Sequence, residues 1–275
     1  MIGRRLRELV SEIRTLPKKK TKKTEYKWLG SLVKWAPAIL LLILWEFAVG
    51  DSASNQFFSQ PSLIIQRMIQ DLSRGLLQIH ALETIKEIMM GYFLGVTIGF
   101  FLGYFSGINE KVAGIIQPYA FLLNSIPKVA IAPLVIIWFG IGPSSKIALA
   151  TLMVFFLVFF NVFLGVRGIK RDYIDLAHIM GAKSREIILH VVLPSITPFI
   201  FTGLKQSIVF AMIGALVGEF VAASRGLGYY IQLAAGSLDA TGVFVGVFIL
   251  MGFVMLVIVL IDLLEKSIVR WNPSR

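Results

Sequence analysis

The chain of 275 residues has no cysteine and only three histidines. Without cysteine it forms no disulfide, zinc–thiolate site, iron–sulfur cluster or cysteine nucleophile. His80, His178 and His190 fall in separate segments, without the spacing of a metal site, so no metal is expected. No serine stands in the nucleophile-elbow pattern of hydrolases. These absences favour a protein that is not an enzyme.

Charge is also scarce. Charged residues make up 16% of the sequence, against roughly 25% in soluble domains, while hydrophobic residues make up 56%. Several apolar runs reach the ~20 residues that a helix needs to cross a bilayer. The first begins only after about thirty polar residues and has no small-residue cleavage pattern, so no cleavable signal peptide is expected. We predict an all-α, multi-pass membrane protein.

Six membrane spans are predicted, and prolines are expected to break the third. A short amphipathic helix beginning at Pro61 is predicted between the first two spans, on the outer surface. It either packs on the bundle or docks an external partner. The six spans cover residues 32–49, 82–104, 112–139, 147–166, 196–221 and 243–264.

Positive charge is concentrated at the N-terminus. Residues 1–34 hold eleven Lys and Arg residues against three Glu, and thus +8 of the net +11. A nucleic-acid patch is one interpretation, but a basic run next to a membrane span is more typical of a cytoplasmic anchor on anionic lipid. Lys and Arg also gather in residues 167–190 and near the C-terminus. Both termini and that loop are therefore assigned to the cytoplasm, and no nucleic-acid partner is expected.

Two predicted spans carry ridges of small residues at every fourth position, which let another helix approach closely. We interpret both as packing surfaces, and smooth ridges also suit helices that slide past one another. The ridges are Gly91, Gly95, Gly99 and Gly103 in the second span, and Gly203, Ser207, Ala211 and Ala215 in the fifth.

No nucleotide-binding loop is found. The segment from Gly140 to Lys146 has some of the glycines of a phosphate-binding loop, but it lacks the second Gly before Lys, and Ile147 replaces Ser or Thr. It also falls on the side assigned as external. We predict a turn there, and active transport then requires an energy source outside this chain.

Ionisable residues inside a membrane are functional candidates because their burial is costly. Lys128 stands between two prolines, where a broken helix faces protein or a cavity. It either attracts an anionic substrate in the pathway or pairs with Glu219 or a carbonyl group. Lys205 and Glu219 are further pathway candidates. Glu83, Lys86 and Glu87, at the outer start of the second span, are expected to pair locally.

A polar interruption at residues 172–194 separates two apolar stretches. Its length and spacing exceed what a connecting loop needs, so it is expected to be held by another protein. We predict that Ala177 and Gly181 share one helix face, where small side chains let a partner close around the backbone. Leu193 and Pro194 are expected to end the segment. Its pattern runs Asp175-Leu176-Ala177, then Gly181, then Val191-x-Leu193-Pro194.

This pattern resembles the EAA loop in the membrane subunits of binding-protein-dependent ABC importers: Glu-Ala-Ala, three residues, Gly, nine residues, Ile-x-Leu-Pro. The departures are Asp for Glu, Leu for Ala and Val for Ile. A narrower resemblance, to permeases for nitrate, sulfonates, taurine or bicarbonate, covers about residues 35–265. It rests on Ile126-Pro127-Lys128, Ala132-Pro133-Leu134, Trp138-Phe139-Gly140-Ile141-Gly142, Ser145-Lys146, Gly218-Glu219 and Gly226-Leu227-Gly228-Tyr229.

The resemblance implies the type I importer permease fold, with a basic tail (1–31), a permease domain (32–265) and a C-terminal tail (266–275). It implies a bacterial inner-membrane location, and docking of residues 172–194 on separate ATPase subunits, which use ATP and Mg²⁺. This chain itself is expected to bind no cofactor. The implied partners are an ATPase dimer, a second permease copy, an external binding protein and membrane lipid. The expected coupling residues are Asp175, Ala177, Gly181, Ala182, Lys183, Leu193 and Pro194.

The leading function is a permease subunit that forms the pathway for a small anionic solute, of the sulfonate, taurine, nitrate or bicarbonate class. The same machinery importing a vitamin precursor or an aromatic acid is the alternative. An ion-coupled secondary transporter, with Lys128, Lys205 and Glu219 as its relay, is disfavoured by the spacing within residues 172–194. A membrane enzyme ranks last.

Overall fold

The computed structural model describes residues 27–49 and 58–269, and this part of the chain is helical without β-strands. The chain divides into two units at Ala48 and Val49. The described part of the first unit is one helix, α2 (Lys27–Ala48), which contains Pro37 and matches the first predicted span. Most of the basic tail lies outside the described residues.

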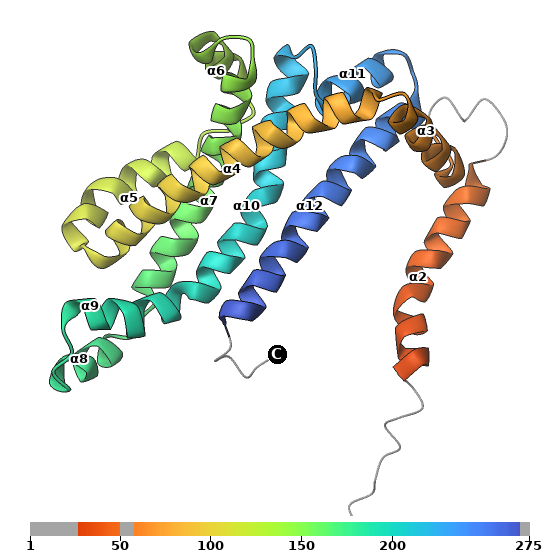
Figure 1. The fold of residues 1–275 in the computed structure, drawn as a ribbon. Helices are drawn as coiled ribbons and strands as arrows, with labels where there is room; N and C mark the ends of the chain where they lie inside the picture. Colours follow the sequence, from red (N-terminus) through yellow and green to blue (C-terminus); the bar gives the residue numbers. More distant parts are fainter. Residues whose placement is uncertain (1–26, 50–57, 270–275) are drawn as a thin grey trace, which may run out of the picture. The chain divides into compact units, whose positions relative to one another are not determined.

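The second unit contains the other described helices (Figure 1). They are α3 (Pro61–Ser73), α4 (Leu76–Ile108), α5 (Glu110–Asn124), α6 (Ala132–Phe139), α7 (Pro143–Arg167), α8 (Arg171–Ile179), α9 (Ser184–Ile187), the π-helical turn η2 (Ile188–Val192), α10 (Leu193–Ala222), α11 (Leu227–Gly236) and α12 (Ala240–Ile268). Within the described residues, four helical stretches are long and apolar enough to cross a membrane: Leu76–Ile108, Pro143–Arg167, Ser184–Ala222 and Ala240–Ile268. They correspond to the second, fourth, fifth and sixth predicted spans.

The third predicted span is broken, as the prolines indicate. Helix α5 ends at Asn124 and α6 begins at Ala132, with Pro127 in the turns between them. Pro133 lies in the first turn of α6, where its missing N–H costs no helical hydrogen bond. The break leaves Lys128 on a short non-helical stretch beside α7.

The glycine ridge of α4 lies directly against α7. A Cβ atom added at Gly95 would stand 2.6 Å from the Cβ of Val154, and one added at Gly99 would stand 2.7 Å from the backbone oxygen of Phe155. Gly91 and Gly103 are equally enclosed by α7. Real side chains do not approach this closely, so only glycine permits the observed separation of the two helices.

Helix α10 covers α7 as well. On its ridge Gly203 faces the side chain of Asn161, and Ser207, Ala211 and Ala215 have no exposed surface. α7 therefore packs against both α4 and α10 and forms the centre of the second unit.

The predicted amphipathic helix is α3, and Pro61 stands in its first turn. Its Ile64 is buried, and the helix packs on α4 and α12. Asp71, although charged, is also buried; it accepts hydrogen bonds from Arg67 Nε and from the hydroxyl of Tyr230 on α11, each at 2.8 Å. Burial and the Asp71 carboxylate raise the pKa of Tyr230. The hydrogen bond between Tyr230 and Asp71 therefore links α11 to α3.

Candidate functional site

Helices α8 and α9 form a hairpin beyond the ends of α7 and α10 (Figure 1). Gly181 ends α8: its φ of +83° is left-handed, its N–H donates to His178 O at 2.9 Å, and the N–H of Ala182 donates to Ala177 O at 3.0 Å. This is the Schellman arrangement that closes helices at a glycine. The predicted shared helix face of Ala177 and Gly181 is therefore wrong, because Gly181 lies beyond the helix end.

The second half of this hairpin continues into the membrane helix. The backbone N–H of Lys183 donates to the carboxylate of Glu186 at 2.7 Å, which caps α9. The N–H of Leu193 donates to Ile188 O, five residues back, in the π-helical turn. This wider turn carries the helix through Pro194, which has no N–H to donate. Helix α10 begins at Leu193 with Pro194 in its first turn, as predicted, but no break separates it from the hairpin, since α9, η2 and α10 form one stretch, Ser184–Ala222.

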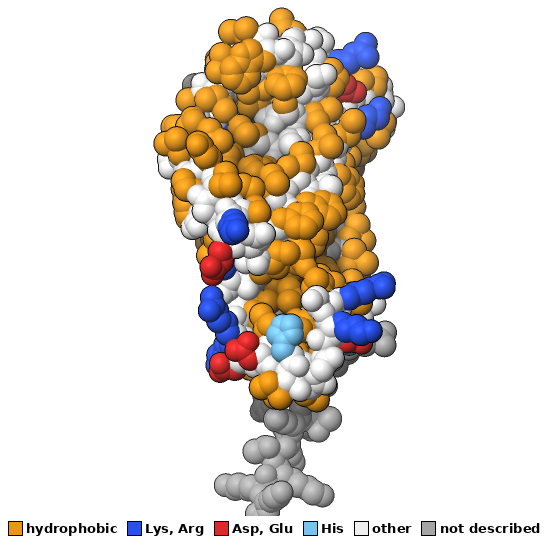
Figure 2. All heavy atoms as spheres, turned by 90° about the vertical axis from the view of Figure 1, so that its left-hand side faces the viewer, with side chains coloured by type: hydrophobic (Ala, Val, Ile, Leu, Met, Phe, Trp, Pro, Cys, Tyr) orange, Lys and Arg blue, Asp and Glu red, His pale blue; other side chains and the backbone are white. Residues whose placement is uncertain are grey.

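The hairpin exposes an unusual amount of apolar side chain, which we call the coupling surface. Ile179 is 83% and Met180 79% exposed. A groove of about 460 Å³ lies between α8, η2 and the start of α10, and a second of about 480 Å³ lies between α8, α9 and η2; both are lined by Ala177 and His190. In Figure 2, which faces this side, charged side chains flank a strip of hydrophobic ones that holds a histidine. The coupling surface consists of Tyr173, Leu176, Ile179, Met180 and Leu189.

Of the predicted coupling residues, Asp175, Gly181 and Lys183 are exposed. Ala177 and Ala182 are half-buried and pack against the hydrophobic core. Leu193 and Pro194 are half-buried as well, at the start of α10. The backbone N–H groups of Gly181, Ala182 and Lys183 make the hydrogen bonds that end α8 and cap α9, so these residues determine the conformation of the hairpin.

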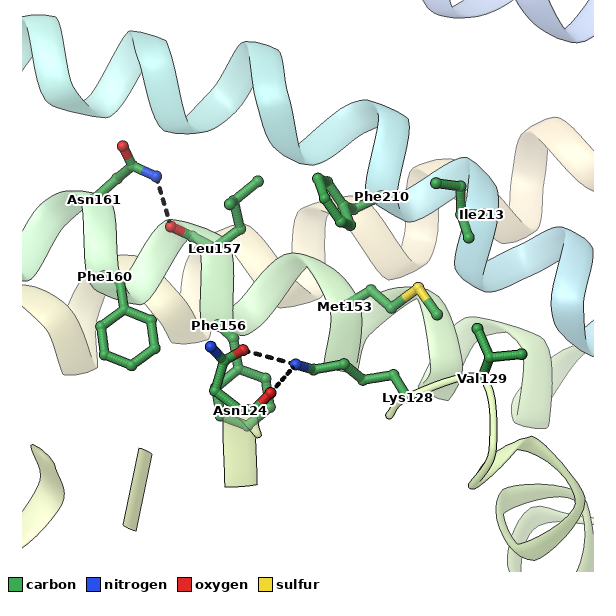
Figure 3. Close-up of a pocket in the computed structure, with 10 residues that line it drawn as sticks. All are labelled: Asn124, Lys128, Val129, Met153, Phe156, Leu157, Phe160, Asn161, Phe210 and Ile213. Atoms are coloured by element: carbon green, nitrogen blue, oxygen red, sulfur yellow. Dashed lines mark hydrogen bonds between the residues drawn. The ribbon is translucent and has the colours of Figure 1, made fainter. Parts of the chain in front are cut away.

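A cavity of about 450 Å³ lies between α7, α10 and the break between α5 and α6 (Figure 3). Lys128 points into it from the break. Its Nζ donates to the backbone oxygen of Asn124 at 2.6 Å and to the side-chain oxygen at 2.7 Å, and lies 4.9 Å from the ring centroid of Phe156. Of the two partners considered for Lys128, the carbonyl group is thus found and Glu219 is not. The lining residues are Asn124, Lys128, Val129, Met153, Phe156, Leu157, Phe160, Asn161, Phe210 and Ile213.

Lys205, the second charged pathway candidate, lies outside this cavity. Its Nζ donates to Asp262 Oδ1 at 2.6 Å and to the carboxylate of Glu265, so that it joins α10 to α12. Among the described pathway candidates, only Lys128 lines the cavity.

Glu219 lies in a buried polar cluster. Its carboxylate accepts hydrogen bonds from the Thr84 hydroxyl at 2.6 Å and from the backbone N–H of Gly228. A Cβ at Gly226 or Gly228 would overlap this carboxylate, which explains why glycines stand there. Glu219 thereby holds the turn between α10 and α11 against α4.

Lys146 and Glu87 belong to the same buried region, and their pairing was not predicted from the sequence. Lys146 Nζ donates to Glu87 Oε1 at 2.7 Å, and the side chains are only 5% and 2% exposed. The local pairing expected of Glu87 is therefore wrong, and so is the inclusion of Lys146 in the predicted turn. Its proximity to Gly142-Pro143 suggested a turn, but Pro143 begins α7 and places Lys146 on the buried face of its first turn.

No group of three or more potential metal ligands occurs among residues 27–49 and 58–269. The family model described as "Binding-protein-dependent transport system inner membrane component" matches residues 95–270.

Three relatives have similar lengths. The formylaminopyrimidine transport permease protein ThiX of Halalkalibacterium halodurans is 32% identical, over 86% of this chain and 94% of the relative. The riboflavin transport system permease protein RibX of Chloroflexus aurantiacus is 36% identical, over 86% and 88%. The taurine transport system permease protein TauC of Escherichia coli is 29% identical, over 86% and 87%.

A solved structure of the MetNI methionine ABC transporter, described as inward facing, has a chain that is similar in fold. It is 21% identical, with a TM-score of 0.61 over 71% of this chain and 96% of that one. The type I importer permease fold expected from the resemblance is therefore confirmed.

Proposed function

This chain belongs to the family of binding-protein-dependent transport system inner membrane components, the permease subunits of ABC importers, and from that premise we propose how its parts work. It is an integral inner-membrane protein with several membrane-crossing helices. Two copies form the translocation pathway, a pair of separate ATPase subunits drives them with ATP and Mg²⁺, and an external binding protein delivers the solute.

The observation that carries this proposal is the coupling surface. Five large apolar side chains, from Tyr173 to Leu189, stand exposed on a hairpin that is too short and too charged to lie in lipid. Clustered apolar exposure of this kind is typical of a protein interface. The hairpin is continuous with α10, so a partner that grips it acts directly on a membrane helix.

The solute passes the cavity at Lys128, and we propose that it is small and anionic. Lys128 is the one cation that lines this cavity. Lys205 and Glu219 have protein partners on other helices, so we assign them to holding α10 in place. Relatives named for taurine, for formylaminopyrimidine and for riboflavin support a framework that serves both sulfonate and ring-bearing solutes.

The docking proposal is tested by Ile179→Asp on the coupling surface. A charge there removes apolar contact area and leaves the fold intact, because Ile179 is 83% exposed. We expect this variant to reach the membrane at normal levels and to lose the ATPase subunit when the complete transporter is purified through a tag on the permease. Losing one well-packed apolar anchor costs about 2 kcal/mol or more, which corresponds to roughly thirtyfold in affinity.

The matched control is Ile141→Asp, the same change at a residue that is 82% exposed in the turn before α7. It should retain the ATPase. Normal retention by Ile179→Asp, or equal loss in both variants, would show that the ATPase does not dock on the coupling surface.

A further inference from the structure

We propose that the cavity at Lys128 accepts a planar aromatic solute with a single negative charge, an arenecarboxylate or arenesulfonate, in preference to an inorganic oxyanion. This inference rests on the proposed function, because it takes the cavity to be part of the translocation pathway. It follows from the composition of the walls, the number of free hydrogen-bond donors and the size of the space.

The walls are mostly apolar. Seven of the ten lining residues carry no polar group, and three of these are phenylalanines. Phe156 and Phe160 lie one turn apart on α7, and Phe210 faces them from α10 (Figure 3). Aromatic rings gain most from contact with another flat ring, whereas a hydrated oxyanion gains nothing from such walls and must give up water to touch them.

The polar groups suit one charge rather than several. A lysine ammonium has three N–H donors, and Lys128 gives two of them to Asn124. One donor therefore remains for a solute, beside the amide of Asn124. Charge-assisted donors bind an inorganic oxyanion most strongly, and among the residues of this chain that line the cavity only Lys128 is a charged donor.

A polar acceptor stands at a second point in the cavity. Asn161 on α7 donates its amide N–H to Leu157 O at 2.8 Å, which orients the side chain and leaves the amide oxygen as an acceptor. A ring with an anionic group near Lys128 and a hydroxyl or amino group near Asn161 would satisfy both. Figure 3 shows the two residues separated by the apolar side chains between them.

The size agrees with this assignment. The space of about 450 Å³ falls within the range of pockets that take ring-bearing small molecules, roughly 300–1,000 Å³. An inorganic ion would fill only a small part of it. Weak binding is expected, because a transported solute must also leave.

The absence of cysteine allows a direct test. Ile213→Cys introduces a single thiol on the α10 wall, and Ser184→Cys introduces one on the exposed end of the hairpin as the control. Both full-length variants are placed in lipid nanodiscs and labelled with a small water-soluble methanethiosulfonate. The labelling rate is then measured with benzoate, benzenesulfonate, nitrate or taurine at equal millimolar concentration and ionic strength.

We expect benzoate and benzenesulfonate to slow labelling at position 213, nitrate and taurine to have little effect, and none of the four to affect position 184. Adding Phe160→Leu should weaken the protection by benzoate about two- to tenfold, the value of one aromatic contact. Equal protection by nitrate or taurine, or labelling that no anion slows, would overturn the aromatic assignment and leave the pathway intact. No labelling at position 213 would overturn the pathway itself, and with it this part of the proposed function.

Discussion

Close contact between α4 and α7 depends on glycine, and Gly99→Ala tests this dependence most sharply. The added Cβ would stand 2.7 Å from Phe155 O and 3.1 Å from Phe159 N, both backbone atoms of α7. Ordinary contact begins at 3.4 Å, so the helices must separate by about 0.7 Å at this point. No side-chain rotation relieves the overlap. Overpacking of this kind costs about 1–3 kcal/mol.

Alanine also favours a helix over glycine by about 1 kcal/mol, and this gain must be separated from the packing cost. Gly114→Ala is the matched control, because Gly114 lies inside α5 and its added Cβ would meet no atom within 4 Å. Gly114→Ala should stabilise the protein. The difference between the two variants then gives the packing cost alone.

The assay is thermal unfolding of the full chain in nanodiscs, followed by circular dichroism. For a domain of this size, each kcal/mol shifts Tm by about 2–4 °C, so Gly99→Ala should melt several degrees below Gly114→Ala. A combined Gly99→Ala and Gly103→Ala variant should lose less than the sum, because one separation of the helices accommodates both side chains. Equal Tm values for Gly99→Ala and Gly114→Ala would refute the argument.

Two further predictions concern buried polar contacts. Glu87→Gln should destabilise the chain by about 1–3 kcal/mol in the same unfolding assay, because Lys146 loses its charge-assisted hydrogen bond while the Glu219 carboxylate remains in electrostatic range. Adding Lys146→Met should cost less than the sum of the two single changes, and an additive double variant would contradict the pairing. Tyr230→Phe removes the hydrogen bond to Asp71 and should cost about 1 kcal/mol at neutral pH. Burial and the Asp71 carboxylate raise the pKa of Tyr230 in the folded state, so the stability that the tyrosine contributes is present below its unfolded pKa of about 10 and is lost as the pH rises through the folded value. The stability difference between wild type and Tyr230→Phe should therefore shrink above about pH 10. A difference that stays constant would show that folding does not raise this pKa.

The sequence predicted the helices that periodicity and hydrophobicity define. The spacing of the glycines from Gly91 to Gly103 indicated a close contact, and the prolines around Lys128 indicated a broken span. Neither pattern predicts which helix packs against the ridge, because a ridge of small residues can pack against any apolar helix. That α7 lies between α4 and α10 follows only from the three-dimensional packing.

The polar sites were harder to predict. Lys146 comes three residues after Pro143 of the Gly142-Pro143 turn pattern. From sequence alone, a lysine in a loop cannot be distinguished from a lysine in the first turn of a helix whose side chain points toward Glu87. Gly181 was predicted to share a helix face with Ala177, but its role depends on a left-handed φ, which glycine permits without requiring. Pro194 suggested a break because the usual four-residue hydrogen-bonding pattern cannot pass through proline, whereas the π-helical turn that avoids this conflict has no sequence signal.

The continuity of the hairpin with α10 has a mechanical consequence. Helix α10 has 30 residues, which at a rise of 1.5 Å each span about 45 Å, more than the ~30 Å of the hydrocarbon core. Phe210 follows Leu193, the first residue of α10, by 17 residues, about 26 Å along the axis. A tilt of about 10° around the Leu193 end would move Phe210 sideways by about 4.5 Å. Helix α10 thus has the geometry of a lever arm: a small rotation imposed at the hairpin would displace a residue of the cavity wall by several ångströms.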